Sequence, residues 1–496
     1  MSNLKKWLMV LMCLTLLVSA SACGEKKAAQ PEEETSGVPA DTYEIQWYFV
    51  NGNAQKDVLA VEEEANKYLK DKINATLKLN CLDWGTYSNK VSTMMASGSP
   101  MDIVLTSSSI LSYSQNVAKG NYLDITDLFA KYAPETSEML KNVIDAAKVN
   151  GKLYGIPANK DTAHRYGFVY NKEIAEKHNL DMQSVTSFSD LEPILSVIRE
   201  KEPELIGYGI GGSRTPYDLI DFDFIAGYDQ VGAFYSDKQD DKVVNQFETP
   251  EFEESVRLSR KFYDEGFIYK DAATAKNFDQ LQKQGQIFTY MDKLQPTKLN
   301  EINAASANIV YDAVYVSEII RSNDDVKGSM VAIPRTSKNP ERVMRFIELF
   351  NTDPFLNNLV NFGIEGKHYT KIDEKTISPI KDSGYDQVGM QWIFGNTFIN
   401  YFLPNMPADR NEKLKEYNEN AIPMKSLGFC FDNESVKVEV SACANVTKEF
   451  LQNLTSGAVD VDTSLPQFLQ KLQQAGADKI IQEEQLQYDT WLKEQK

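Results

Sequence analysis

The sequence predicts an α/β fold, because strand and helix patterns alternate along most of its length. In residues 44–106, short apolar runs are separated by stretches with helical periodicity. The same alternation returns after residue 150. About 455 residues follow the polar N-terminal segment, which is enough for two or three domains with cores of their own. We therefore expect more than one α/β body.

The first body is expected to be a βαβαβ series with short links. In chain order the series is a strand at 44–50, a helix at 56–70, a strand at 75–82, a helix at 87–96 and a strand at 101–106. In the first helix, Val58, Val61 and Ala65 share one face. Strands joined by helices imply a parallel sheet. Ligands of such sheets bind beyond the carboxyl ends of the strands.

The second body follows a turn at residues 150–157. Its expected elements are a strand at 167–171, a helix capped by Ser187 with Asp190 three residues later, a helix from Thr249-Pro250 to Gly266 and a strand at 285–291. Residues 331–333 then lead to a helix that starts at Asn339-Pro340. Proline at the first helical position and glycine after the last helical residue are typical of helix ends. This alternation again predicts an α/β body.

The N-terminus is expected to be an export signal followed by a linker. Two lysines, an uncharged apolar run and small residues before Cys23 are typical of a secretory signal at residues 1–22. A cysteine directly after small residues resembles the bacterial lipobox, in which the thiol is acylated. Lipoboxes usually carry Leu at the position of Ala20, so ordinary secretion is the alternative. Residues 23–43 are polar and are expected to be a flexible linker.

Composition and motifs exclude several classes of function. The net charge of −19 argues against nucleic acid as a partner, because nucleic-acid binding needs basic patches. Cysteines are few, so no disulfide framework is expected, although a Cys430–Cys443 bridge stays open. The three histidines are scattered, and HExxH, CxxC and GxSxG patterns are absent. Carboxylates are abundant, but nothing selects a glycosidase pair.

Several segments carry a family resemblance when taken in order. They are GKLYGIP at 151–157, FVYNK at 168–172, the helix at 249–266, VAIP at 331–334 with NPE at 339–341, GIEGKHY at 363–369, KLQQAG at 471–476 and the stretch at 485–492. This series resembles the family 1 extracellular solute-binding proteins, the receptors of ABC-type importers. The C-terminal motifs resemble one branch of that family, which ends in a domain of unknown function and is generally regarded as a group of sugar-importer lipoproteins.

The resemblance implies a two-lobed, periplasmic-binding-protein-like (type II) α/β fold with a hinge and an extra C-terminal helical or α+β segment. Lobe 1 would comprise residues 44–158 and about 290–345, lobe 2 residues 159–289 and about 346–425, and a C-terminal domain packed on the lobes residues 426–496.

The resemblance also implies a lipid-anchored receptor on the outer face of a bacterial cell membrane. Such a receptor captures a mono- or oligosaccharide by hinge closure and delivers it to permease subunits. We expect a monomer without cofactor, metal or catalytic residues. Two alternatives stay open: a receptor for a peptide or other small solute, and an anchored enzyme that acts on polysaccharide.

Candidate ligand contacts follow from the chemistry of sugars, which present apolar C–H faces and hydroxyls that both donate and accept. Trp84, after the second strand, and Trp392, in a glycine-flanked segment, are the expected aromatic platforms. Core packing is the alternative for both, and the more natural reading for Trp47 within its strand. The expected polar contacts are Asn51, Asn53, Asp83, Ser107, Ser108, Asn159, Lys160, Asp292, Lys293 and Glu365. Each of these has a cap, a turn or a solvated side chain as its alternative.

Overall fold

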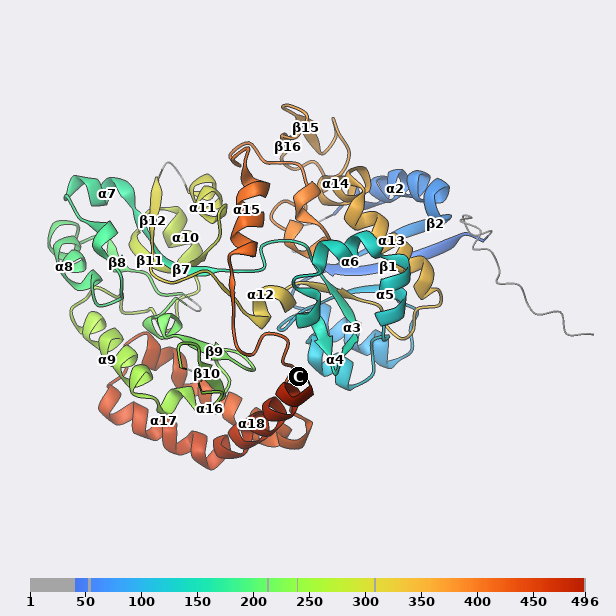
Figure 1. Ribbon diagram of the computed structural model, residues 1–496. Coiled ribbons are helices and arrows are strands. Elements are labelled where there is room, and N and C mark those ends of the chain that lie inside the picture. The colour runs from blue at the N-terminus through green and yellow to red at the C-terminus, as the bar shows by residue number, and fades with distance from the viewer. Residues whose placement is uncertain (1–40, 52–54, 212–213, 239, 307–308, 495–496) are drawn as a thin grey trace, which may run out of the picture. The chain divides into compact units, whose positions relative to one another are not determined.

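The computed structural model describes residues 41–51, 55–211, 214–238, 240–306 and 309–494 (Figure 1). Cys23 and the whole expected signal lie outside these ranges, as does Asn53. Helices and strands alternate as predicted, so the α/β fold class is confirmed.

The first sheet has the strand order β2-β1-β3-β14-β6. Its strands are β1 (Tyr43–Val50), β2 (Ala75–Leu82), β3 (Ile103–Thr106), β6 (Gly155–Pro157) and β14 (Met330–Ala332). β1 is parallel to β2 and β3, whereas β14 is antiparallel to β3 and β6. The expected βαβαβ series is thus confirmed, and the carboxyl ends of β1, β2 and β3 meet at one edge of the sheet.

Helices from two distant parts of the chain cover this sheet. The early ones are α2 (Val58–Ile73), α3 (Tyr87–Ala96), α4 (Tyr113–Ala118), α5 (Thr126–Tyr132), α6 (Pro134–Leu140) and η1 (Ile144–Ala147), with the short strands β4 (Lys148–Val149) and β5 (Lys152–Leu153). The late ones are α13 (Pro340–Thr352) and α14 (Pro354–Phe362), which contact α2 (Figure 1).

The position of α13 differs from the expected boundary, which put residues 346–425 in lobe 2. Trp47 of β1 contacts Phe346, Phe350 and Phe394 edge to face, with ring centroids 5.0–5.8 Å apart. The apolar face of α13 needs an apolar partner, and the buried face of β1 provides it. Trp47 is 2% exposed, so its expected core position is confirmed.

The second sheet has the strand order β12-β7-β11-β8. Its strands are β7 (Arg165–Asn171), β8 (Ile206–Tyr208), β11 (Ile287–Leu294) and β12 (Tyr311–Tyr315). β7 runs antiparallel to β11 and β12, and β8 is parallel to β11. This sheet also differs from the expected boundary, which gave residues 290–345 to lobe 1. The chain returns to the first sheet only after β12 has paired with β7.

Short helices and a small ribbon complete the second lobe. They are α7 (Lys172–Lys177), η2 (Met182–Ser184), α8 (Leu191–Lys201), η3 (Pro216–Leu219), β9 (Phe222–Phe224), β10 (Ala233–Tyr235), η4 (Gln246–Glu248), α9 (Pro250–Asp264), α10 (Phe278–Lys283) and α11 (Lys298–Ala305).

The chain passes between the sheets in residues 158–164, 316–329 and 395–425. The second passage contains β13 (Ile320–Arg321) and α12 (Asn323–Lys327), and the third contains η6 (Thr397–Ile399), α15 (Arg410–Glu419) and β17 (Ile422–Pro423). β13 pairs with β17 and also bridges His164, so the passages are hydrogen-bonded to one another. The hairpin of β15 (Tyr369–Lys371) and β16 (Ile377–Pro379) and the turn η5 (Gln391–Ile393) precede the third passage.

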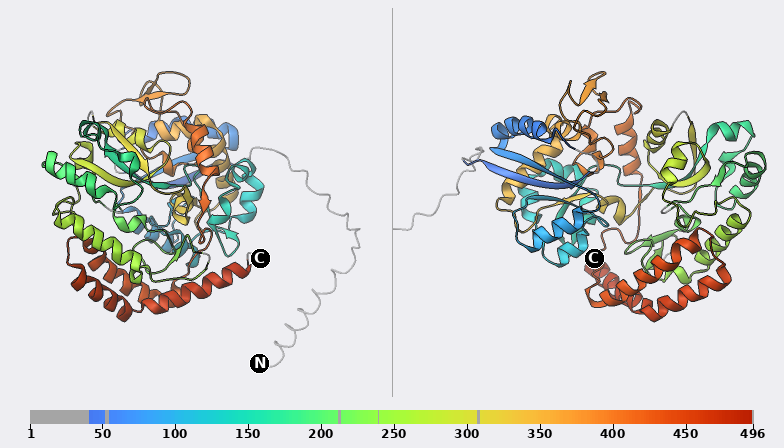
Figure 2. Two further views of the ribbon diagram at one scale, coloured as in Figure 1. Left: turned by 60° about the vertical axis from the view of Figure 1, so that its left-hand side comes forward. Right: turned by 180° about the vertical axis from the view of Figure 1, so that it is seen from behind.

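The C-terminal segment is helical and packs on the second lobe. It consists of η7 (Glu434–Val436), α16 (Lys437–Thr455), α17 (Val461–Ala475) and α18 (Ala477–Glu494). Figure 2 shows these helices, in red, beside α9, which both α16 and α17 contact. Phe468 of α17 packs against Phe247 and Phe252 of the second lobe. Cys430 and Cys443 are free thiols, so the bridge left open by the sequence is not formed.

Candidate ligand-binding site

The most prominent feature at the carboxyl ends of the first sheet is a pair of stacked indoles. The rings of Trp84 and Trp392 have centroids 6.3 Å apart and planes 21° from parallel. Trp84 is 44% exposed, and Trp392 is half-buried against the first core. Exposed large aromatic rings of this kind offer a flat apolar surface to a ligand. The structure therefore brings together the two tryptophans that the sequence selected separately.

Trp392 reaches this position because its neighbours are anchored in the core. Ile393 and Phe394 are buried, and Phe394 packs edge to face on Trp47 with centroids 5.5 Å apart. The short helix η5 then turns Trp392 outward, toward the end of β2.

The polar residues at the same strand ends hold the turns that follow the strands. One Asp83 carboxylate oxygen accepts from the Gly85 N–H at 2.8 Å and shapes the entry to α3. The buried Ser107 hydroxyl accepts from the Ile110 N–H at 2.7 Å, whereas the neighbouring Ser108 is exposed. Asn51 is buried, and its amide donates to the Asp386 carbonyl at 2.9 Å. These bonds account for the polarity of Asn51 and Ser107, and their ligand roles stay predictions.

Asn159 and Lys160 lie in the first passage between the lobes. The Asn159 amide donates to Asn396 Oδ1 at 3.0 Å, and its backbone N–H donates to the Gly395 carbonyl at 2.8 Å. The Lys160 ammonium donates to the Asp161 carbonyl at 2.7 Å. Asn159 thus joins the first passage to the third, which is a hinge position.

Asp292 and Lys293 end β11 on the second lobe. One Asp292 carboxylate oxygen lies 3.6 Å from the Arg214 guanidinium, and both side chains are partly buried. Lys293 is exposed, and its ammonium lies 5.7 Å from the Tyr166 ring centroid. The sequence analysis missed Tyr166, which the pairing of β7 with β11 places opposite Lys293, and Arg214, which follows β8, the other neighbour of β11.

A buried hydrogen-bonded pair at the hinge, His164 and Asp325, was also missed. His164 Nδ1 lies 2.8 and 2.9 Å from the two carboxylate oxygens of Asp325, and His164 is 4% exposed. Burial alone would raise the pKa of Asp325, but the charge of His164 and the hydrogen bonds from His164 and Ser322 hold it well below its usual range. Ser322 and Asp325 form a capping box, a pattern visible in the sequence.

Glu365 lies apart from these groups, in the turn before β15. It is exposed, and its carboxylate forms an ion pair with Lys371 at 3.0 Å. The ion pair accounts for its charge, and a ligand role for Glu365 stays a prediction.

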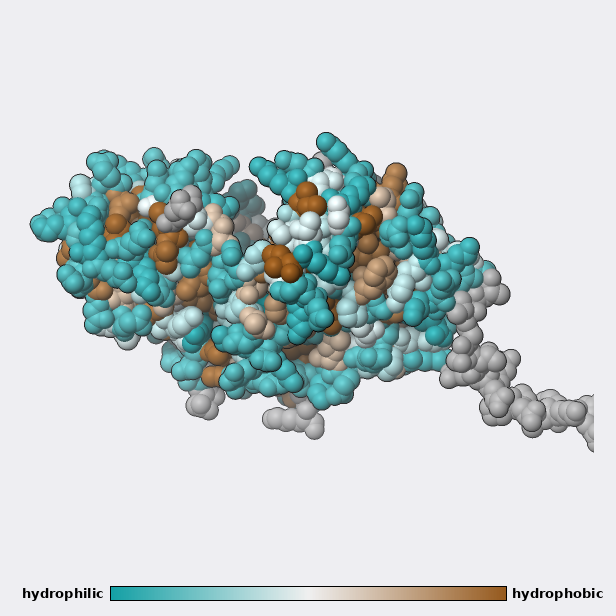
Figure 3. Space-filling view, turned by 90° about the horizontal axis from the view of Figure 1, so that it is seen from above, coloured by the Kyte–Doolittle hydropathy of each residue, from teal (hydrophilic) through white to brown (hydrophobic). Residues whose placement is uncertain are grey.

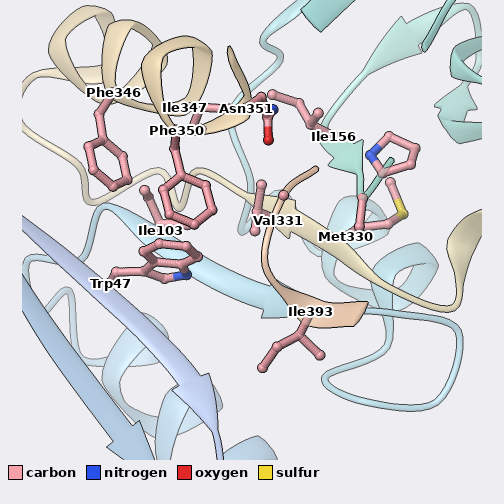
Figure 4. Close-up of a pocket in the computed structure, with 13 residues that line it drawn as sticks. Trp47, Ile103, Ile156, Met330, Val331, Phe346, Ile347, Phe350, Asn351 and Ile393 are labelled. Carbon is pink, nitrogen blue, oxygen red and sulfur yellow. The ribbon is translucent and has the colours of Figure 1, made fainter. Parts of the chain in front are cut away.

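A void inside the first lobe is too small to be the site. It measures about 20 Å³ and is lined by apolar side chains of the core, among them Trp47, Val331 and Phe350 (Figure 4). That volume holds about one water molecule.

The described part of the chain lacks two further features. No helix there is long and apolar enough to cross a membrane, and no three His, Cys, Asp or Glu side chains are grouped to hold a metal ion.

The face seen in Figure 3 is largely hydrophilic, with small and separate apolar spots.

Comparison with protein families gives two matches. Residues 64–362 match the family described as bacterial extracellular solute-binding protein. Residues 425–493 match a domain of unknown function (DUF3502), which coincides with the C-terminal helices.

Individual relatives agree with these matches. A carbohydrate ABC transporter substrate-binding protein of Streptococcus pneumoniae is 32% identical, with the whole of both chains aligned. The crystal structure of an N-glycan transport solute-binding protein (NgtS) from the same species covers 91% of this chain and 100% of its own, with 31% identity and a TM-score of 0.82. Its complexes with Man1GlcNAc and Man5GlcNAc give TM-scores of 0.74 and 0.70.

Proposed function

The chain belongs to the bacterial extracellular solute-binding proteins, and we propose that it captures an oligosaccharide outside the cytoplasm for delivery to an ABC importer. The observation that carries this proposal is the exposed Trp84–Trp392 stack at the carboxyl ends of the first sheet. The 31% identical N-glycan transport protein, crystallised with Man1GlcNAc and Man5GlcNAc, supports the ligand class. We therefore propose a ligand that contains mannose and N-acetylglucosamine.

The two indoles supply the apolar part of recognition. A pyranose ring has a face of C–H groups, and stacking that face on an aromatic ring removes both surfaces from water. Two neighbouring rings would bind more than one sugar unit, which favours an oligosaccharide over a monosaccharide.

Polar side chains from both lobes supply hydrogen bonds to the hydroxyls. On the first lobe these are Asp83 and Ser108, and on the second Asp292 and Lys293. A carboxylate accepts and an ammonium donates, and a hydroxyl can do both, so this mixture suits a neutral sugar better than an anion.

Hinge closure would bring the two sets of polar groups onto one ligand. The crossing passages, joined by the Asn159–Asn396 bond and the β13–β17 pairing, form the hinge. The NgtS structure described without a ligand aligns better with this chain than its saccharide complexes do. This difference supports a rearrangement of the lobes on binding.

Anchoring and partners complete the proposal. We propose that the Cys23 thiol is acylated with diacylglycerol and that the signal is then cut off, since two acyl chains are enough for stable attachment to a membrane. The closed receptor would then dock as a monomer on the permease subunits. We also propose that the chain is not an enzyme, in line with its relatives, which are described as binding proteins.

Calorimetry with Man1GlcNAc and Man5GlcNAc tests the function. The secreted chain without residues 1–23 is titrated, together with the variants Trp84→Ala and Trp392→Ala. Each variant should bind about thirtyfold more weakly, because truncating a central aromatic anchor costs about 2 kcal/mol or more. Trp491→Phe is the control, since this ring lies in α18 and packs on Tyr488 of the same helix and on Phe429, which precedes η7.

Three outcomes would contradict parts of this proposal. Absence of binding to any saccharide would refute a carbohydrate ligand. Full affinity in both tryptophan variants would refute the stacking site. Saccharide that is recovered in cleaved form would show an enzyme instead of a receptor.

A further inference from the structure

A larger pocket lies away from the tryptophan stack, on the hinge side of the second lobe. It has a volume of about 340 Å³, and its walls come from the start of β7, the end of β12, the residues after β11 and one face of α15. We call it the hinge pocket. Its lining includes Arg165, Gln295, Tyr315, Lys413, Glu416 and Asn420.

Strand order separates this pocket from the tryptophan stack, although Gln295 follows closely on Asp292 and Lys293, the proposed second-lobe contacts. β7 and β12 are the strands of the second sheet that continue directly into the crossing passages. Trp84 follows β2, which is one edge strand of the first sheet. The first passage begins after β6, which is the edge strand on the other side of that sheet. The hinge pocket therefore lies beside the edge of the second sheet that adjoins the crossing passages. The tryptophan stack lies at the edge of the first sheet that is farthest from the start of the first passage.

The hinge pocket contains charged groups that lack protein partners. No hydrogen bond or ion pair among the described residues involves the Arg165 guanidinium, and its Nε–H is buried. The guanidinium lies over the Tyr315 ring, 3.1 Å from its centroid. Glu416 is exposed and likewise has no ion pair within the described chain, whereas Lys413 pairs with Asp409 at 3.0 Å.

Arg165 is half-buried, and none of its guanidinium N–H groups has a protein acceptor among the described residues. An unpaired donor is costly, so the accessible part of the guanidinium is poised to donate to a bound molecule. Tyr315 is 44% exposed and adds an aromatic wall. Gln295 and Asn420 add amides that both donate and accept. The pocket volume is within the usual range for small-molecule sites.

We propose that the hinge pocket is a second binding site, which takes one neutral sugar ring. The unpaired guanidinium would donate to ring hydroxyls, the unpaired Glu416 carboxylate would accept from them, and the aromatic wall would face the C–H groups. An anionic ligand would satisfy Arg165 but would be repelled by Glu416. The inference rests on the proposed carbohydrate ligand and adds to it, because the pocket needs neither tryptophan but adjoins Asp292 and Lys293.

Saturation-transfer NMR on the secreted chain tests the proposal. The probes are methyl α-mannopyranoside, N-acetylglucosamine and glucuronate, each alone. The variants Arg165→Gln, Tyr315→Ala and Asn420→Ala should weaken binding of a neutral probe at least tenfold. Arg345→Gln is the matched control, because Arg345 also lies over an aromatic ring, Tyr132, at 4.5 Å but pairs with Glu341 outside the pocket.

The outcomes separate the two sites. Loss of neutral-sugar transfer in the pocket variants, with unchanged transfer in Trp84→Ala and in Arg345→Gln, supports a second site. No transfer to either neutral probe, or equal transfer in all pocket variants, overturns it. Tighter binding of glucuronate overturns the neutral class. Failure here leaves oligosaccharide binding at the tryptophans intact, since tryptophan fluorescence reports that site independently.

Misfolding of a variant does not leave the proposal untested. Asn420 is exposed at the end of α15, so Asn420→Ala is expected to keep the melting temperature of the parent. If Tyr315→Ala unfolds, the Asn420→Ala and Arg165→Gln variants still show whether the hinge pocket binds the neutral sugar. Man5GlcNAc is then titrated into the same variants. If the hinge pocket binds one arm of the oligosaccharide, the affinity for Man5GlcNAc falls in these variants. If the pocket binds a separate free sugar, the affinity for Man5GlcNAc does not change.

Discussion

The two lobes are built from the chain in different ways. In the first lobe, β1, β2 and β3 follow one another within residues 43–106 and pair in parallel. In the second lobe, β7, β8, β11 and β12 are spread over residues 165–315, and its core is completed by helices that begin at Lys437. The parallel strands of the first lobe are therefore close in sequence, although β14, β6 and α13 complete that lobe, whereas the core of the second lobe needs the end of the chain.

This difference bears on function, because each lobe supplies part of the proposed site. The tryptophan stack rests on the first core through Phe394 and Trp47. Asp292 and Lys293 end β11 of the second sheet, which shares its lobe with the C-terminal helices. Damage to those helices should therefore disturb one half of the site and spare the other.

The largest expected effect comes from Phe468→Ala in α17. Phe468 is fully buried, and its ring centroid lies 5.1 Å from Phe247 and 5.7 Å from Phe450. Loss of a buried phenylalanine costs about 3–5 kcal/mol of unfolding free energy. Hydrogen exchange read by mass spectrometry should rise in α9, α16 and α17 and stay unchanged in β1–β3.

Phe346→Ala is the matched variant for the first lobe. Phe346 is 1% exposed and packs on Trp47 with centroids 5.8 Å apart. Its exchange pattern should be the reverse, with faster exchange in β1 and α13. Uniform acceleration over both lobes in either variant would break the comparison, because it would mean that the lobes unfold together.

A pH-dependent effect is expected from Glu484 in α18. Its side chain is fully buried, no described residue bonds to either carboxyl oxygen, and burial raises its pKa well above the ordinary value. The carboxyl packs against Gly232 of the second lobe, where a side chain would collide with it. The folded protein thus holds a proton that the unfolded chain releases above about pH 4.5.

The sign of the pH effect follows from this proton. Stability falls as the pH rises from the unfolded pKa toward the folded one, by at most about 1.4 kcal/mol for each pH unit. Glu484→Gln lacks this loss of stability. In urea unfolding, its unfolding free energy should equal that of the parent near pH 4 and should exceed it by a growing amount up to pH 8. Glu483→Gln, which changes a half-buried neighbour, is the control and should show no such trend. A constant difference across this range would rule out titration of Glu484 as the cause.

Local sequence patterns were enough to predict the βαβαβ part of the first lobe and the starts of several helices. Asn339 and Thr249 cap α13 and α9 through their side chains, with proline at the first turn of each helix, as the sequence indicates. The expected cap at Ser187 is shifted: α8 begins after Asp190, whose carboxylate accepts from the Ser187 N–H. Such differences are small, because caps act within one turn of the helix.

Pairing across long sequence distances was not predictable. β12 has no local feature that assigns it to β7, and α13 carries an apolar face that fits either lobe. The same reason explains the site. Trp84 and Trp392 were each recognisable as candidates, but their stacking, and the hinge pair of His164 and Asp325, depend on contacts between distant segments.

The smallest expected effect comes from Glu365→Gln at the margin of the first lobe. The ion pair of Glu365 with Lys371 is solvent-exposed, with side chains 54% and 39% accessible, and such pairs contribute about 0–1 kcal/mol. We expect the unfolding free energy to fall by less than about 1 kcal/mol and Man5GlcNAc affinity to change less than twofold. Lys371→Gln breaks the same pair and is the matched control. If Glu365→Gln alone weakened binding tenfold, Glu365 would be a ligand contact, and the binding site would extend from the tryptophan stack to the turn before β15.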